Sequence, residues 1–152
     1  MQRTKAPFSR RTARAVALKA LYESDASGHS AMEAGSRLVQ DEEINTEGTA
    51  FAMELVKGTV EHSQEIDGLI AKFAPAWPVE QIPVVDRNIL RMAIFEMIFH
   101  KATPPKVVIN EAVELAKTFG SESSPRFVNG VLGSLAGQHS AQELEATNKR
   151  ER

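Results

Sequence analysis

Apolar residues recur at every third or fourth position along most of the chain, as they do on one face of an α-helix. The first such stretch follows Ser9, a residue type that favours the capping position, and predicts a helix that ends near Ser24. A loop over 25–30 contains a glycine, and a weaker apolar pattern then predicts a second helix over 31–40. An acidic connector over 41–43 separates this pair from the next segment.

Two further helices are predicted over 47–73, because helical spacing continues through this segment with one break at His62–Ser63. Three prolines fall within 74–83. Since proline lacks an amide donor and clashes with the preceding turn, we expect no helix to cross this stretch. The segment 84–99 is apolar on nearly every side, which predicts a buried central helix.

The C-terminal part carries two more helical patterns. An amphipathic pattern over 106–119 predicts a helix that is closed by Gly120 in a left-handed conformation. Ser124–Pro125 is typical of the start of a helix, which we expect to end near Leu135. Asn129–Gly130 is also a common hairpin turn, but its flanks lack the alternation of strands, so a helix is the better interpretation.

These patterns together predict an all-α fold of about seven helices in two packed helical bundles. We expect an N-terminal bundle over 9–73, a linker over 74–82 and a C-terminal bundle over 83–136. The two ends, 1–8 and 137–152, have no apolar stripe. They are expected to form a flexible basic arm and a flexible tail.

The composition agrees with a globular protein, because 42% of the 152 residues are apolar and 25% are charged. No stretch approaches the roughly 20 apolar residues that a membrane span needs, and the N-terminus lacks the apolar segment of a signal peptide. The absence of cysteine excludes disulfides, thiolate zinc sites and a cysteine nucleophile. We therefore expect a cytoplasmic protein.

The charge is distributed unevenly, although the net value is only −2. Residues 1–22 carry six basic side chains and no acidic one, which leaves −8 for the rest of the chain. Such an asymmetry indicates an anionic partner, and nucleic acid and acidic lipid are the usual candidates. The lipid is disfavoured, because the apolar stripe of the first helix is small, rich in alanine and needed for packing.

The chain carries no sequence motif of catalysis, such as a phosphate-binding loop, a dinucleotide-binding turn or a zinc-protease motif. The histidines are scattered, and His62 with Glu65 lacks a third ligand at a suitable spacing. Asp86 and Glu96 are not in helical register with each other, so they do not suggest an acid–base pair. We expect no enzymatic activity, no metal and no cofactor.

Three arginines at the start of the first helix form the best candidate site. Arg10, Arg11 and Arg14 are spaced to project from one side, and the spacing continues to Tyr22. Guanidinium groups beside a ring suit single-stranded RNA, whose phosphates need positive charge and whose unstacked bases need a flat surface. The alternative is a solvated helix start with Tyr22 in the core. Cations at a helix N-terminus oppose the helix dipole, which favours the binding interpretation.

Several sequence blocks resemble the NusB family of small bacterial transcription antitermination factors. The longest is PKVVINEAVELAK, followed by FG and by SPRFVNGVL, and shorter ones are RRTAR, ALY, VDR and ILR. Together they span about residues 9–136. The resemblance implies two helical bundles, a role in antitermination of ribosomal RNA transcription, and binding of boxA RNA together with the ribosomal protein NusE in a complex with RNA polymerase.

The resemblance also implies which residues contact RNA. It places the arginine-rich helix start and the aromatic Tyr22 on the RNA, as the spacing does, and adds Asp86, Arg126 and Phe127. Phe127 has the alternative of a core residue, and Asp86 that of a partner for the helix dipole. At Ser123 this chain departs from relatives that have an acidic residue, a change that should not weaken RNA binding.

Two alternative functions remain open from the sequence. One is a helical adaptor that binds only protein, with the arginines facing an acidic partner. The other is a stand-alone relative of the NusB-like RNA-binding domain of ribosomal RNA cytosine methyltransferases. A monomer and a homodimer are both compatible with the sequence.

Overall fold

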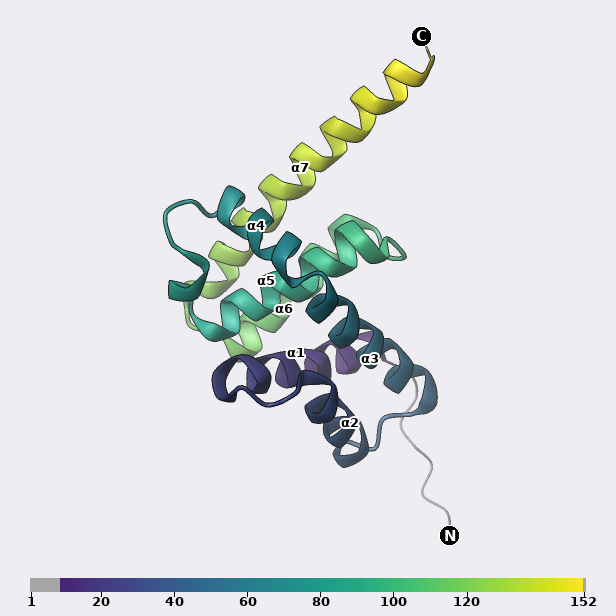
Figure 1. Ribbon diagram of the computed structural model, residues 1–152, viewed down its shortest axis with the longest axis vertical. Helices are drawn as coiled ribbons and strands as arrows, with labels where there is room; N and C mark the ends of the chain where they lie inside the picture. Colours follow the sequence, from purple (N-terminus) through teal and green to yellow (C-terminus); the bar gives the residue numbers. More distant parts are fainter. Residues whose placement is uncertain (1–8, 152) are drawn as a thin grey trace.

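The computed structural model describes residues 9–151, with the side chains of residues 9–142, and the arm predicted over 1–8 lies outside this range. The described chain is helical and contains no strand, so the predicted all-α fold of seven helices is confirmed (Figure 1). The α-helices and two short turns (η) are α1 (Arg10–Ser27), α2 (Ala31–Asp41), α3 (Thr46–Glu61), α4 (Ser63–Phe73), η1 (Val79–Gln81), α5 (Val84–Ile94), η2 (Phe95–His100), α6 (Pro105–Phe119) and α7 (Ser124–Glu151).

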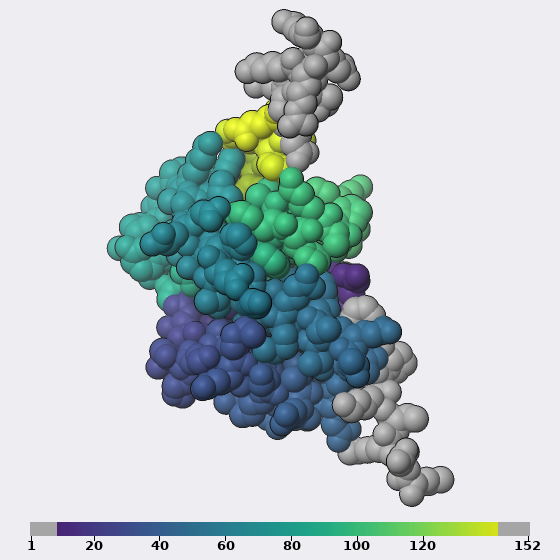
Figure 2. Space-filling view, turned by 45° about the vertical axis from the view of Figure 1, so that its right-hand side comes forward, coloured from purple at the N-terminus to yellow at the C-terminus, as the bar shows by residue number. Residues whose placement is uncertain are grey.

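The helices form two packed groups, with α1, α2 and α3 in the first and α4 to α7 in the second. In Figure 2 the first group, purple to blue, lies below the teal and green second group. The helix α5 joins them, because it packs on α1 and α3 as well as on α4, α6 and α7. The sequence placed α4 with the N-terminal bundle, whereas its buried face, Ile66 and Ile70, packs mainly on α5 and α7. The division therefore falls at His62.

Two helix ends differ clearly from the predicted ones. Apolar spacing does not set the last residue of a helix, because backbone contacts at its end also decide where it stops. Ser9 caps α1 as expected, since its side chain accepts the amide of Thr12. The helix continues to Gly28, whose left-handed conformation (φ 79°) lets its amide donate to the carbonyl of Ser24 at 2.8 Å. At the other end of the chain, α7 runs to Glu151 instead of ending near Leu135, and its last part projects from the body in Figure 1.

Gly120 ends α6 for a different reason from the one predicted. Its backbone is extended (φ −93°, ψ −168°) and not left-handed. A β-carbon at this position would lie 2.5 Å from the hydroxyl oxygen of Ser124. The glycine therefore permits close approach of the α6–α7 loop to the start of α7.

The central helix is buried as predicted, with Ile89, Leu90 and Ile94 fully enclosed. Its last turn, η2, widens into a π-helical turn, a feature that is rare in proteins and shifts the side chains that follow. Among the described residues, no helix combines the length and apolar character required to cross a membrane.

A charged network ties the end of α1 to the second group. The carboxylate of Asp25 accepts hydrogen bonds from Arg87 at 2.6 and 2.8 Å, from Asn88 at 2.8 Å and from Arg91 at 3.0 Å. Arg91 also forks onto Asp67 of α4 at 2.8 and 3.0 Å. The hydrogen bonds from Arg87, assisted by Asn88 and Arg91, lower the pKa of Asp25 to about 2 although burial opposes the shift. The network therefore requires Asp25 to be ionised.

This network predicts a loss of stability in acid. Because the folded-state pKa of Asp25 is depressed, its contribution is complete above the unfolded pKa near 4 and is lost as the pH falls towards 2. We expect Asp25→Asn to lower the free energy of unfolding at pH 7 by up to about 2 kcal/mol, with the difference from wild type disappearing near pH 2. Urea denaturation at several pH values measures this. The same change at Asp41, which is exposed at the end of α2, is the control, and a difference that persists at pH 2 would contradict the assignment.

Candidate nucleic-acid interface

The three arginines of the first helix do not lie on one surface. Arg11 points to α6, where its guanidinium donates to both carboxylate oxygens of Glu111 at 3.0 and 3.1 Å. Arg10 points to α3 and places its guanidinium carbon 4.5 Å from the centre of the Phe51 ring. Successive residues of a helix are separated by about 100°, so the two neighbours face different helices.

Arg14 departs most clearly from the expectation that the three arginines share one accessible surface. Its guanidinium forks onto Glu96 of η2 at 2.9 and 2.5 Å, and the two residues are only 4% and 1% exposed. The guanidinium also lies 5.3 Å from the Phe51 ring. Arg14 therefore joins α1 to the second group of helices as a buried ion pair and does not belong to the accessible surface.

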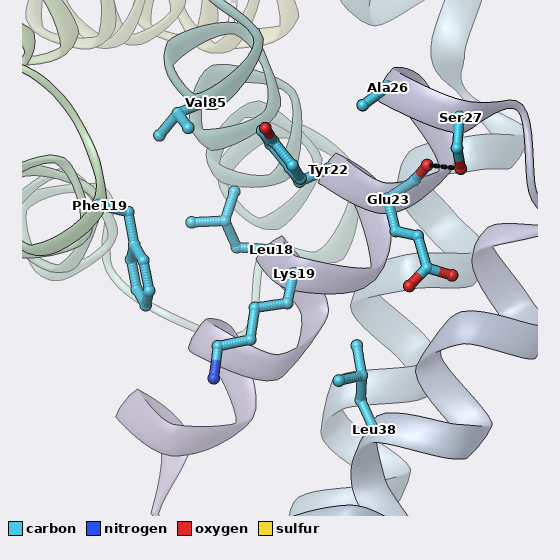
Figure 3. Close-up of a pocket in the computed structure, with 9 residues that line it drawn as sticks. All are labelled: Leu18, Lys19, Tyr22, Glu23, Ala26, Ser27, Leu38, Val85 and Phe119. Carbon is cyan, nitrogen blue, oxygen red and sulfur yellow. Dashed lines mark hydrogen bonds between the residues drawn. The ribbon is translucent and has the colours of Figure 1, made fainter.

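Tyr22 lies in an open groove and not in the core, since 44% of its surface is exposed. Figure 3 shows its ring beside Leu18 and Val85, with Phe119 across the hollow and Leu38 of α2 on the far side. We call this hollow, with a volume of about 540 Å³, the tyrosine groove. It is lined by Leu18, Lys19, Tyr22, Glu23, Ala26, Ser27, Leu38, Val85 and Phe119.

A second groove continues the first along α1. This arginine groove lies between α1 and α6 and has a volume of about 280 Å³. It is lined by Arg11, Thr12, Ala15, Glu111, Glu114, Leu115, Thr118 and Phe119. Phe119 belongs to both grooves and is 37% exposed. One path therefore runs along α1 from Arg11, past Phe119, to Tyr22.

Lys19 adds a second cation to this path. Its ammonium nitrogen lies 6.0 Å from the centre of the Phe119 ring and 2.6 Å from the carboxylate of Glu42. The path therefore combines two exposed rings with two cations that carboxylates already neutralise. Sequence reasoning missed Lys19 and Phe119 as site residues. The spacing from Arg11 through Ala15 to Lys19 marks this face of α1, whereas nothing in the sequence brings Phe119 to it.

Asp86 is buried and serves the fold, contrary to the RNA contact that the family resemblance implies. It is 4% exposed, and one of its carboxylate oxygens accepts the hydroxyl of Ser124 at 2.7 Å. The same Ser124 oxygen accepts the amide of Ser121 at 2.9 Å. Asp86 thus fixes the loop before α7 against α5, and its neighbour Val85 forms a wall of the tyrosine groove.

Arg126 and Phe127, in the first turn of α7, lie in different environments. Arg126 is exposed and lines a shallow hollow together with Ser121, Glu122 and Ser123. Phe127 is partly buried and packs against the core. Arg126 can therefore reach a ligand without rearrangement, whereas the ring of Phe127 offers only part of its surface.

These features define a class: small all-helical proteins with a groove of exposed rings and cations along the first helix, the combination used to bind unpaired nucleic acid. The profile of the NusB family matches residues 11–137. The chain belongs to the NusB family, as its sequence blocks predicted. Residues 138–151 of α7 lie outside the matched region.

Curated relatives and solved structures agree with this assignment. The chain is 50% identical over 128 residues to a transcription antitermination protein NusB of Dehalococcoides mccartyi, a match that covers 84% of this chain and 90% of the relative. It is 44% identical over 151 residues to the same protein of Chloroflexus aggregans, covering 98% and 100%.

Two solved structures are similar to this chain in fold. NusB of T. maritima superposes with a TM-score of 0.82 at 34% identity, over 92% of this chain and 97% of that one. A structure of the antitermination factors NusB and NusE in complex with double-stranded RNA superposes with a TM-score of 0.76 at 34% identity, over 82% and 93%. The curated relatives are both named as transcription antitermination proteins.

Proposed function

We propose that this protein is a cytoplasmic transcription antitermination factor without catalytic activity, which binds boxA RNA of ribosomal RNA transcripts together with NusE. Its family and the similar NusB–NusE–RNA structure support this function. The complex then joins RNA polymerase. The observation that carries the RNA-binding part is the path along α1, where the exposed rings of Tyr22 and Phe119 lie beside Arg11 and Lys19.

Each side chain of the path has a separate role in this proposal. The rings of Tyr22 and Phe119 stack with unpaired bases, which tolerate many sequences because every base has a flat face. Arg11 and Lys19 meet phosphates, and the exposed Arg126 adds a cation in a separate hollow beside the start of α7. Three or four phosphate contacts give a slope of log affinity against log salt of only about −2 to −3. So weak a hold explains why NusE is required to complete the RNA-binding surface.

Single substitutions on the path test the proposal. We expect Tyr22→Ala to weaken binding of a boxA RNA in the presence of NusE by about ten-fold or more, because stacking contributes about 1–3 kcal/mol per base. Arg11→Ala should weaken it by about three- to ten-fold and make the salt slope about 0.7 less steep, since one phosphate contact is lost. Fluorescence anisotropy with labelled boxA RNA, as a single strand and as a duplex, gives both quantities.

Trp77→Ala is the matched control for the aromatic change, because Trp77 is 57% exposed and lies outside both grooves. Calorimetry of binding to NusE alone separates an effect on NusE binding from an effect on RNA binding. If Tyr22→Ala loses affinity for NusE and keeps its affinity for RNA, the ring belongs to the protein interface. Equal affinity of the wild-type complex for boxA and scrambled RNA would contradict the proposed function.

A protein-only adaptor remains the second candidate, because the walls of the tyrosine groove are largely apolar and its cation Lys19 is already paired with Glu42. Such walls also suit the apolar side chains of a partner protein. Unchanged RNA affinity of Arg11→Ala together with lost NusE affinity of Tyr22→Ala would favour the adaptor. Sedimentation of the free protein decides between monomer and homodimer.

A further inference from the structure

Arg11, the cation at the start of the proposed RNA path, is already paired with an acidic side chain of the same protein. Arg11 is exposed, with 67% of its side chain accessible, yet both ends of its fork reach Glu111, whose side chain is 19% accessible. The bonds of 3.0 and 3.1 Å cross from α1 to α6 and form part of the wall of the arginine groove. The guanidinium thus already has the bidentate acidic partner that a phosphate would otherwise supply.

The charges around the contact reinforce it. The hydrogen bonds of Arg11, and then its charge, lower the pKa of Glu111, so the carboxylate is ionised at neutral pH. Glu111 in turn raises the pKa of Arg11, with a smaller contribution from the charge of Glu114. A phosphate that approaches Arg11 therefore meets a pair without net charge, and it must displace or share a carboxylate.

We infer that Glu111 is a counter-charge that keeps Arg11 from holding the phosphates of any unpaired RNA, so that binding depends on stacking at the rings. This inference rests on the proposed function. An RNA that only offers phosphates gains little at Arg11, because it exchanges one anion for another. An RNA whose bases also stack on the rings of the tyrosine groove gains enough elsewhere to displace Glu111. The carboxylate thus weakens the binding of every RNA, and only an RNA that also stacks on the rings is still held.

The test uses the full chain and single-stranded oligouridine of 20 nucleotides as a sequence-independent probe. We expect Glu111→Gln to bind this probe about five-fold more tightly than wild type and with a salt slope about 0.7 steeper, because one more phosphate is neutralised. The affinity for boxA RNA with NusE should rise by a similar factor, because boxA RNA has to displace the same carboxylate. Fluorescence anisotropy at several salt concentrations measures both.

Glu114→Gln is the matched control, because it removes the same charge one turn along α6 while Glu114 bonds Lys117 at 3.2 Å on its own helix. If Glu114→Gln tightens oligouridine binding as much as Glu111→Gln does, the effect is one of net charge and the inference fails. In the Arg11→Ala background the gain should shrink to that of Glu114→Gln, because only a general charge effect is left, and an undiminished gain there would overturn the inference. Failure of the proposed function is a separate result: wild type with NusE would then not prefer boxA RNA at all.

Discussion

Replacing Glu96 by alanine is expected to lower the free energy of unfolding by about 3–5 kcal/mol, because the change leaves the buried guanidinium of Arg14 without its carboxylate. Both side chains lie out of water, at 1% and 4% exposure, and are joined by two hydrogen bonds. An isolated charge in such a place cannot be hydrated without opening the interface between α1 and η2. Urea denaturation followed by circular dichroism measures the loss.

A double variant separates the ion pair from the packing. Arg14→Met with Glu96→Leu replaces both charges by apolar groups and should cost no more than about 1–2 kcal/mol, since well-packed apolar pairs often equal buried ion pairs. The exposed pair of Lys57 and Glu61, 4.0 Å apart on α3, is the control, where Glu61→Ala should cost less than about 1 kcal/mol. A similar small cost for Glu96→Ala would show that water reaches the Arg14 guanidinium.

The buried pair also bears on the RNA path. Arg14 lies against one ring, that of Phe51, and Arg10 lies over the same ring at 4.5 Å. Loss of Glu96 would therefore disturb the residue on which Arg10 rests, even though Glu96 itself is inaccessible. RNA affinity of a Glu96 variant thus reports on the positions of its neighbours and not on a direct contact.

The helices could be predicted because their signal is local. The signal comes from short segments: apolar spacing, the serine cap at Ser9 and the prolines between 74 and 83. In the structure Ser9 caps α1, and no α-helix crosses 74–83. The tertiary assignment of α4 could not be predicted in the same way. Its apolar face fits either group, and only the packing on α5 and α7 decides which one it joins.

The site was predicted in part, and its errors have one physical origin. Spacing along α1 left Tyr22 open between the surface and the core, and the structure places it at the surface with 44% exposure. Spacing also could not tell an arginine that faces solvent from one that faces a buried carboxylate. The partner of Arg14 lies 82 residues away, in a turn that departs from regular helical register. Likewise, Glu111 and Phe119 reach the path only because α6 packs beside α1 there. Long-range pairing of charged side chains leaves no periodic trace in one sequence.

The same π-helical turn makes Gly58 the most constrained glycine of the described chain. A β-carbon on Gly58 of α3 would lie 2.0 Å from the ring of Phe95, well inside contact distance. That ring also stacks with His62 at 5.9 Å between centres, so it cannot turn away freely. We expect Gly58→Ala to lower the free energy of unfolding by about 2–3 kcal/mol through overpacking, although alanine is the better helix former.

Two companion variants make this expectation specific. Gly68→Ala on α4 adds the same methyl group where no other part of the protein lies within 4 Å, so it should stabilise the protein by about 0.5–1 kcal/mol through helix propensity alone. Phe95→Leu removes the atoms that the new β-carbon meets, and in that background Gly58→Ala should cost markedly less than in the wild type. If Gly58→Ala stabilises the protein as Gly68→Ala does, then α3 and η2 can separate at low cost. The close approach of the two groups of helices would then not limit stability at this point.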